Sequence, residues 1–236
     1  RSRAAPKRYV YEYPRPALTV DMVVLAIADH DLRVLLIRRG EPPFRGRWAL
    51  PGGFVNVRDD GDQGEDVDHA AARELHEETG LRPRDVFLQQ LRAFGKPGRD
   101  PRGRVVSIAY FALVPVDLLH RVRAGDDAAE ARWVPVAELP EMRLAFDHDE
   151  VLDVALRTIR ERLVSDLRIA ASLVPAEFTK AELRHVFESV SGTAYDKSNF
   201  NKRFNRMIQD GVIALAPGRR PLSGPGRPAR LYAFAS

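Results

Sequence analysis

The sequence predicts an α/β (α+β) fold, with a mixed sheet flanked by helices in a first domain and a smaller domain after it. Three observations predict this fold. The chain has 236 residues, which suits one medium and one small domain. Before the linker-like segment 172–175, strand-like and helix-like segments are mixed along the chain. After it, the order of the predicted elements changes. We expect an N-terminal arm over 1–16, a first domain over 17–171 and a second domain over 172–236.

The composition is that of a globular chain, with 44% hydrophobic and 30% charged residues. The longest apolar run, over 20–27, is interrupted by Asp21 and is far too short to cross a membrane. No signal-peptide pattern opens the chain. The sequence has no cysteine, which excludes disulfides, thiolate zinc sites and a thiol nucleophile. We therefore expect a cytoplasmic protein with no membrane partner.

Five strands are expected in the first domain, because apolar and β-branched residues fill five short segments between turn signals. The first two form a hairpin whose turn is Asp29-His30-Asp31. A loop rich in glycine, proline and arginine, over 95–103, joins the third strand to the fourth. The five strands span 19–27, 32–38, 87–94, 105–114 and 131–135.

Two helices accompany these strands. The first is expected over 68–79, with Gly80 in the position of the residue that follows a helix end. The second is an amphipathic helix over 147–164, because its apolar residues recur at helical spacing. Strands and helices in this order predict a central mixed sheet with helices against it.

The segment Arg73–Leu81 carries the strongest chemical signal. Glu74, Glu77 and Glu78 lie one turn apart on the expected helix, so their carboxylates project on one side. Mg²⁺ is bound by a few carboxylates together with phosphate oxygens, so this face can hold a metal-diphosphate. The alternative is a solvated acidic face, which is the commoner outcome for a glutamate-rich turn.

The surroundings of this face resemble the Nudix box, Gly-x5-Glu-x7-Arg-Glu-hydrophobic-x-Glu-Glu-x-Gly-hydrophobic. The match is complete from Glu65 to Leu81, and Pro51-Gly52-Gly53 stands before it. One departure is an insertion: eleven residues, 54–64, separate Gly53 from Glu65 instead of five. In a Nudix enzyme that loop helps to position metal and diphosphate. The resemblance therefore implies a diphosphate site more strongly than it implies turnover.

The second domain has the element order of a winged helix-turn-helix. Thr179 and Glu182 match a capping box before an apolar helical run, which Gly192 ends. A second helix follows over 196–208, with one apolar face and one face rich in lysine, arginine and asparagine. Strands then flank a turn-rich segment over 217–228. The two strands are expected over 212–215 and 229–234.

Positive charge is concentrated in this second domain. Residues 166–236 hold eleven basic and six acidic residues, a balance of +5, and the rest of the chain has a balance of −1. Lysine and arginine neutralise phosphates, and asparagine or arginine can contact base edges. The alternative is an ordinary surface helix. We predict binding of double-stranded DNA through Lys197, Asn199, Asn201, Lys202, Arg203 and Arg206 on the helix and Arg219, Arg220, Arg227 and Arg230 on the wing.

Several further residues are candidates for the first domain's site. Arg99, Arg102 and Arg104 most simply form a solvated hairpin tip, and alternatively approach a diphosphate. The Nudix resemblance implies a further carboxylate near residue 127, as metal ligand or base, with an ordinary loop acid as the alternative. Trp48 and Phe44 either stack on a base or pack in the core. The ligand-binding candidates are Arg38, Arg39, Trp48, Gly52, Gly53, Arg73, Arg99 and Arg102. The metal and catalytic candidates are Glu74, Glu77 and Glu78, joined by Asp127 as a catalytic residue in an active enzyme.

As a whole, the chain resembles Nudix-related transcriptional regulators of NAD metabolism over residues 17–235. The match is carried by 43–44, 48–54, 65–81, 94–102, 146–148, 178–183, 196–200 and 226–232. This resemblance implies a homodimeric repressor of NAD biosynthesis or salvage genes. Such a repressor binds operator DNA and releases it when ADP-ribose or a related NAD metabolite, with any Mg²⁺, binds in the Nudix domain.

Two other functions remain open at this stage. The chain could be a Mg²⁺-dependent ADP-ribose pyrophosphatase, which the intact glutamates favour and the loop insertion and basic second domain oppose. It could also be an RNA-binding or cap-processing Nudix protein. That third function fits the basic tail but does not fit the order of elements in the second domain.

Overall fold

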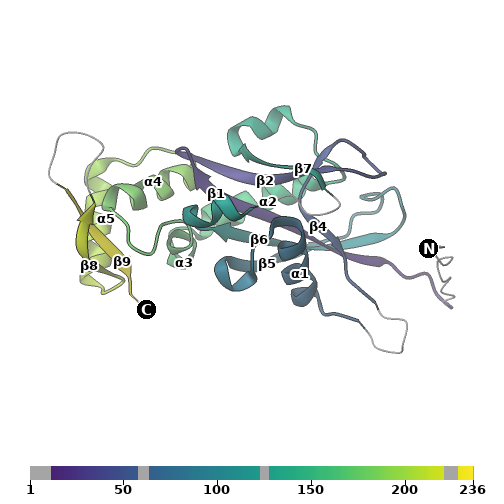
Figure 1. The fold of residues 1–236 in the computed structure, drawn as a ribbon, viewed down its shortest axis with the longest axis horizontal. Helices are drawn as coiled ribbons and strands as arrows, with labels where there is room; N and C mark the ends of the chain where they lie inside the picture. Colours follow the sequence, from purple (N-terminus) through teal and green to yellow (C-terminus); the bar gives the residue numbers. More distant parts are fainter. Residues whose placement is uncertain (1–11, 58–63, 123–127, 221–227, 236) are drawn as a thin grey trace.

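The computed structural model describes residues 12–57, 64–122, 128–220 and 228–235. The chain forms an elongated molecule, with a sheet-based domain at one end and a helical domain at the other (Figure 1). The first domain is built on a seven-stranded sheet in the order β3-β2-β1-β6-β5, with β4 paired to β1 and β7 paired to β2. Its strands are β1 (Ala17–Ala28), β2 (Asp31–Arg39), β3 (Trp48–Ala49), β4 (Gly52–Phe54), β5 (Phe87–Phe94), β6 (Val105–Val114) and β7 (Ala128–Pro135).

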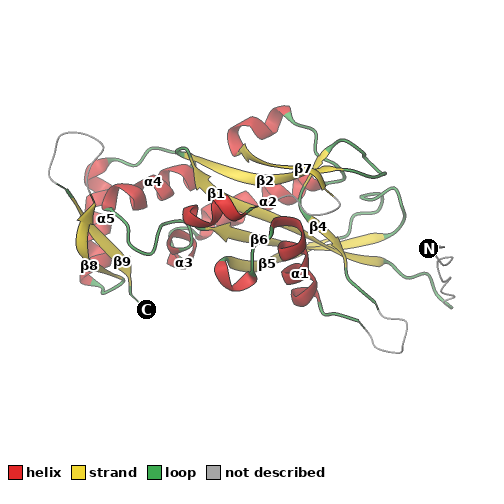
Figure 2. Ribbon diagram, viewed as in Figure 1, coloured by secondary structure: helices red, strands yellow, loops and turns green. Residues whose placement is uncertain are grey.

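The predicted mixed sheet is confirmed, because β1 is parallel to β6 whereas the other pairings are antiparallel. Helices α1 (Val67–Thr79) and α2 (His148–Arg162) cover the two faces of the sheet (Figure 2). Alternate residues of β1 serve the two faces: Met22 lies in the core with α1, and Val23 lies in the core with α2. A central strand buried on both sides explains the nearly continuous apolar run.

Helix α1 has the boundaries that its local sequence predicts, within one residue. Asp66 caps its first turn by accepting a hydrogen bond from the backbone N–H of His69 at 2.8 Å. Gly80 ends it with a left-handed φ of 74°, as predicted. Ala70 and Ala71 are fully buried, so the helix packs closely on the sheet, which fixes the distance of its acidic side from the sheet.

The remaining short elements were not predicted. They are the strands β3 and β4, three 3₁₀ turns, η1 (Pro83–Asp85), η2 (Val116–Arg121) and η3 (Val136–Glu141), and the helix α3 (Leu167–Ala171). Segments this short show no usable hydrophobic periodicity. Helix α3 depends instead on Asp166, which caps it and pairs with Arg162 and Arg168 at 2.6 and 2.8 Å. The hydrogen bonds from Arg168 and Arg162 hold the pKa of Asp166 well below its usual range.

The second domain is the winged helix-turn-helix that the element order predicts. It contains α4 (Lys180–Ser191), α5 (Lys197–Gln209), β8 (Ile213–Arg220) and β9 (Ala229–Phe234). Both bonds of the predicted capping box between Thr179 and Glu182 are present, at 2.7 and 3.2 Å. Phe200 and Phe204 of α5 are buried against Phe187 and Tyr232. The opposite side of α5 is therefore left to solvent.

The two domains share one continuous hydrophobic core. Residues of α2, such as Ile159, belong to the same buried cluster as Leu183 and Phe187 of α4. Polar contacts support this junction, since Arg160 Nε donates to the carbonyl of Val190 at 3.1 Å. We therefore expect the domains to behave as one cooperative unit. Within the described ranges, no helix is long and apolar enough to span a membrane.

Candidate functional site

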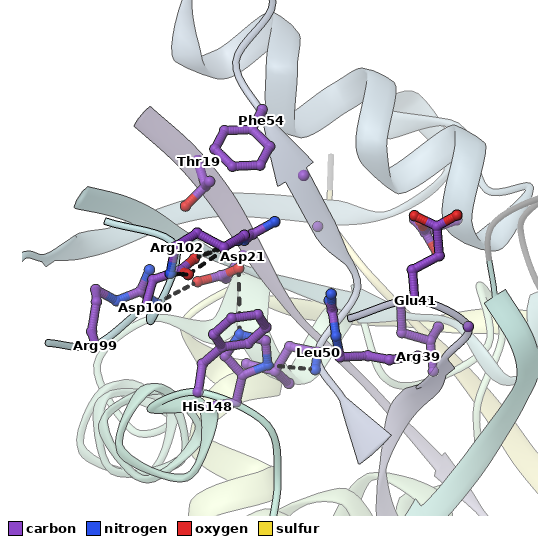
Figure 3. A pocket seen from close by; sticks show the side chains of 16 residues that line it. Thr19, Asp21, Arg39, Glu41, Leu50, Phe54, Arg99, Asp100, Arg102 and His148 are labelled. Carbon is purple, nitrogen blue, oxygen red and sulfur yellow. Dashed lines mark hydrogen bonds and ion pairs between the residues drawn. The ribbon is translucent and has the colours of Figure 1, made fainter. Parts of the chain in front are cut away.

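The first domain contains a cleft made of two adjoining hollows that share Gly52, Gly53, Phe54 and Glu78. The carboxylate hollow, of about 630 Å³, is lined by Arg73, Glu74, Glu77 and Glu78 of α1 together with β4. The arginine hollow, of about 190 Å³, is lined by Arg39, Arg99 and Arg102 and by acids that include Asp21 and Asp100 (Figure 3). The shared residues make the two hollows one continuous site for an extended ligand.

The carboxylate hollow is organised by Arg73. Its guanidinium donates to Glu65 at 2.6 and 3.0 Å, to Glu74 at 2.7 Å and to Glu77 at 2.8 Å. The hydrogen bonds from Arg73 lower the pKa of Glu65, whereas burial raises the pKa of Glu74 despite its bond to Arg73. Glu74 is only 7% exposed, so the alternative of a solvated acidic face is wrong at this position. Arg73 acts here as the counter-charge that holds the carboxylates together.

The glutamates supply hard oxygen donors of the type that Mg²⁺ prefers. Their present geometry does not fit the ion, however: in the described part of the chain, no three acidic or histidine side chains are close enough to surround a cation. Glu74 and Glu77 are instead bound by Arg73. The assignment of Glu74, Glu77 and Glu78 as metal ligands therefore stays a prediction.

The loop insertion is closed off at its base. The backbone N–H of Asn56 donates to Glu65 Oε1 at 2.8 Å, and the N–H of Glu65 donates to the carbonyl of Asn56 at 3.1 Å. Gly64 is required at this closure, because its φ is 90° and a Cβ there would lie 2.1 Å from the Asn56 oxygen. Residues 58–63 of the insertion lie outside the described residues, and the bonds between Asn56 and Glu65 keep β4 and α1 adjacent.

The predicted ligand-binding residue Gly53 sets the distance between β4 and α1. A Cβ at this position would lie 2.2 Å from Glu74 Oε1. We expect Gly53→Ala to displace Glu74 from Arg73 and to lower the free energy of unfolding by about 1–3 kcal/mol. In the matched control Gly95→Ala, the added Cβ would lie an ordinary 3.5 Å from its nearest neighbour. The free energy of unfolding should then change by no more than about 0.5 kcal/mol. Urea denaturation measures both, and equal stabilities of the two variants would contradict this role.

The arginine hollow is built around a buried ion pair. Arg99 donates to Asp21 at 2.9 Å and to Asp147 at 2.6 and 2.8 Å, and its side chain is only 4% exposed. Burial lowers the pKa of Arg99, but the bonds to Asp147 and Asp21 outweigh this and raise it. Figure 3 shows Arg99 on the same side of the cleft as Asp21 and Asp100. The prediction of a solvated hairpin tip is therefore wrong for Arg99.

Two more guanidinium groups lie on aromatic rings in this hollow. Arg102 is bound by Asp100 at 2.7 Å and stands 4.8 Å from the Phe54 ring and 5.5 Å from the Phe146 ring. Arg39 lies 4.8 Å from the same Phe146 ring. Burial and the nearby Arg102 lower the pKa of Arg39. Planar cations beside aromatic faces suit a phosphorylated ligand that also carries a flat ring.

His148 closes the floor of the arginine hollow. Its Nδ1 accepts the backbone N–H of Leu50 at 2.9 Å, which assigns the proton of the neutral ring to Nε2, 3.6 Å from Asp21 Oδ1. The ring is 4% exposed. Burial lowers its pKa, although Asp21 acts in the opposite direction. His148 is therefore a neutral structural group at neutral pH.

This lowered pKa has a measurable consequence. Since the unfolded histidine titrates near 6.5, its contribution to stability is present above pH 6.5 and is lost as the pH falls below it. We expect His148 to account for up to about 1.4 kcal/mol of lost stability per pH unit. His148→Asn keeps an acceptor for Leu50 and should flatten the decline between pH 6.5 and 5.5. His185→Asn is the comparison, because burial also lowers the pKa of His185, whose side chain is half-buried whereas that of His148 is buried. An unchanged slope in His148→Asn would show that the ring titrates normally.

Other predicted residues lie outside the cleft or outside the described residues. Arg38 donates to the carbonyl of Gly46 and pairs with Glu130 at 3.7 Å. Trp48 packs against the main core, which agrees with the core-packing alternative. Asp127 and Arg227 lie outside the described residues.

Sequence reasoning missed Asp21 and His148, which line the cleft, and Asp147, which holds Arg99 there. A signal for Asp21 was present, because it is the charged residue that interrupts an apolar strand. Residues 146–148 entered the prediction only as part of the family resemblance. A buried histidine or aspartate that depends on distant partners leaves no local pattern.

The second domain exposes most of the predicted DNA-binding residues of α5. Asp196 begins the helix by accepting the N–H of Asn199 at 2.8 Å. Arg203 differs from the other candidates, because it is half-buried and donates to the carbonyl of Val164. On the wing, Arg230 is exposed and its backbone pairs with that of Arg219. The exposed helix residues are Lys197, Asn199, Asn201, Lys202 and Arg206.

Comparison with known families assigns the first domain. The family model described as the NUDIX domain matches residues 17–155. The chain belongs to the Nudix family. A second family model, the NrtR DNA-binding winged helix domain, matches residues 170–234, so the Nudix domain is followed by an NrtR-type winged helix domain.

Similar proteins cover the chain in whole or in part. The ADPR-responsive transcriptional repressor NtrR of Acinetobacter baylyi is 34% identical over 95% of this chain and 84% of its own. Shewanella oneidensis NrtR, in a crystal structure with a 27mer DNA, is 30% identical with a TM-score of 0.75, covering 92% of this chain and 93% of that one. Its NUDIX domain complexed with ADP-ribose has a TM-score of 0.54 and 34% identity over 64% of this chain and 90% of that one. The ADP-ribose pyrophosphatase of Methanocaldococcus jannaschii is 40% identical over 61% of this chain and 76% of its own.

Proposed function

We propose that this protein is a transcriptional repressor that releases operator DNA when ADP-ribose, or a related NAD metabolite, binds in its Nudix domain. The carrying observation is the presence, in one chain whose two domains share a hydrophobic core, of a phosphate-compatible cleft and an exposed basic helix. The similarity to the ADPR-responsive repressor of Acinetobacter baylyi over 95% of this chain supports the same pairing of effector and output.

The cleft suits a nucleoside diphosphate sugar in its charge and its surfaces. Arg39 and Arg102 offer positive charge beside the rings of Phe54 and Phe146, where a base or a ribose can pack. Gly52 and Gly53 keep side chains away from the junction between the two hollows. The diphosphate would lie at this junction, where Arg73 offsets the charge of the α1 carboxylates.

The winged helix domain would read operator DNA as part of a homodimer. Lys202 and Arg206 are placed to neutralise phosphates, and Asn199 and Asn201 can bond to base edges. Two-fold dimers place their recognition helices about one DNA turn apart, so the operator would contain two half-sites with that spacing. The regulated genes would be those of NAD biosynthesis or salvage.

A gel-shift titration tests the proposal. The probe is a duplex enriched by the full-length protein from a random-sequence library. We expect specific binding to this duplex and its release by ADP-ribose, with AMP and ribose 5-phosphate as controls that lack the diphosphate. Failure to enrich any duplex, or binding that ADP-ribose leaves unchanged, would refute the proposal.

The alternative is a Mg²⁺-dependent ADP-ribose pyrophosphatase. The complete glutamate set and the 40% identity to the Methanocaldococcus jannaschii enzyme favour it. The loop insertion before Glu65 and the basic second domain oppose it. Release of AMP from ADP-ribose with Mg²⁺ distinguishes the two functions. Metal-dependent release by the wild type that is lost in Glu78→Gln would support the enzyme, and no release would exclude it.

A further inference from the structure

One predicted DNA-binding residue, Arg203, bonds to another part of the chain at the protein surface. Arg203 of α5 is half-buried, whereas its neighbour Lys202 is exposed. Arg203 Nη2 donates to the carbonyl oxygen of Val164 at 3.2 Å, and the guanidinium lies 4.7 Å from the centre of the Phe187 ring. It therefore joins the recognition helix to the segment that follows α2 and to α4.

The other end of α2 is part of the ligand cleft. Asp147, directly before α2, accepts bonds of 2.6 and 2.8 Å from Arg99. His148, the first residue of α2, accepts the N–H of Leu50 at 2.9 Å. The helix has 15 residues and is therefore about 22 Å long. One rigid element thus begins at the cleft and ends beside Arg203.

The middle of α2 gives it little freedom to bend. Five of its residues are buried in the core that the two domains share, and a close-packed interior transmits displacement well. At its far end, Arg160 also bonds to the carbonyl of Val190, so α4 is held by the same helix. The five residues are Val151, Leu152, Ala155, Leu156 and Ile159.

We propose that Arg203 is a positioning residue that couples the cleft to the recognition helix through α2, and that it is not a DNA ligand. A planar guanidinium can donate to a carbonyl and stack on a ring at the same time, which the single ammonium of lysine cannot do. A shift of Asp147 or His148 on ligand binding would reach Val164 and, through Arg203, change the orientation of α5. This inference rests on the proposed function.

The test compares Arg203 with Lys202 in the full-length protein. Fluorescence anisotropy measures affinity for the enriched duplex at several salt concentrations, with and without ADP-ribose, and calorimetry measures ADP-ribose binding directly. Affinity falls as salt rises, and the loss of one phosphate contact makes the plot of log affinity against log salt less steep by about 0.9. We expect this decrease in Lys202→Ala, together with an unchanged release factor. The release factor is the ratio of DNA affinities without and with ADP-ribose.

In Arg203→Ala we expect the opposite pattern. The salt slope and ADP-ribose binding should match the wild type, and the release factor should fall at least fivefold. Arg203→Lys keeps the charge and much of the packing, so it should fold even if Arg203→Ala does not. We expect its release factor to fall as well, with its salt slope unchanged. A slope lowered by about 0.9 in Arg203→Ala, or a wild-type release factor in both variants, would overturn the inference. Failure of the wild type itself to bind the duplex or to respond to ADP-ribose would instead refute the proposed function.

Discussion

Replacing Arg99 with methionine should destabilise the protein by about 3–5 kcal/mol, because it leaves two carboxylates buried without their counter-charge. Asp21 and Asp147 have side chains only 10% and 15% exposed, and Arg99 is 4% exposed. Methionine fills a similar volume, so the loss reports the charge and not a cavity. The affinity for ADP-ribose should fall as well, since the wall of the arginine hollow depends on this ion pair. Urea denaturation and calorimetry measure the two effects.

Two further variants isolate the cause of this loss. Arg99→Met combined with Asp21→Asn and Asp147→Asn removes all three charges, and it should regain most of the lost stability. Arg38→Met is the matched single change, because Arg38 and its partner Glu130 have side chains 51% and 50% exposed, and losing this pair should cost less than about 1 kcal/mol. A triple variant as unstable as Arg99→Met would mean that packing, and not the unpaired charges, dominates.

The elements that were predicted correctly are those with local causes. The strands β5 and β6 have the predicted boundaries residue for residue, because each is an apolar run between turn signals. The predicted caps Gly80 and Thr179 act within three or four residues of their partners. Spacing within a helix likewise places Glu74, Glu77 and Glu78 on one side. Such features are encoded where they occur.

The cleft could be predicted only in part, because its partners come from distant segments. Arg99 is 78 residues from Asp21 and 48 residues from Asp147, and only the complete sheet brings the three together. From its own neighbours the same arginine looked like part of a solvated loop. Arg73 was a ligand-binding candidate, but its four-way contact with the glutamates and Phe54 depends on how β4 meets α1.

Arg203 shows the same limit at the domain junction. It lies three residues after Phe200 and directly before Phe204, at the border of the apolar face of α5. Helical periodicity assigns a border residue to solvent by default. Whether solvent or the first domain lies beside Arg203 depends on where α2 ends, and no pattern within α5 contains that information.

Because the two domains share one hydrophobic core, a substitution in the second domain should also destabilise the first domain. Phe204→Ala should lower the free energy of unfolding by about 3–5 kcal/mol, because the ring is 1% exposed and lies 4.8 Å from the Tyr232 ring. The chain has two tryptophans, Trp48 and Trp133, and both belong to the first domain. If the core is continuous, tryptophan fluorescence in urea will register the full loss, although the substitution lies in the second domain. Ile208→Ala on the same helix is the control, because losing a side chain that is 39% exposed should cost about 1 kcal/mol or less.

A fluorescence transition that stays at the wild-type position while helical circular dichroism is lost earlier would mean that the domains unfold independently. In that case α2 could not carry a signal from the cleft to the DNA-binding surface as a rigid link.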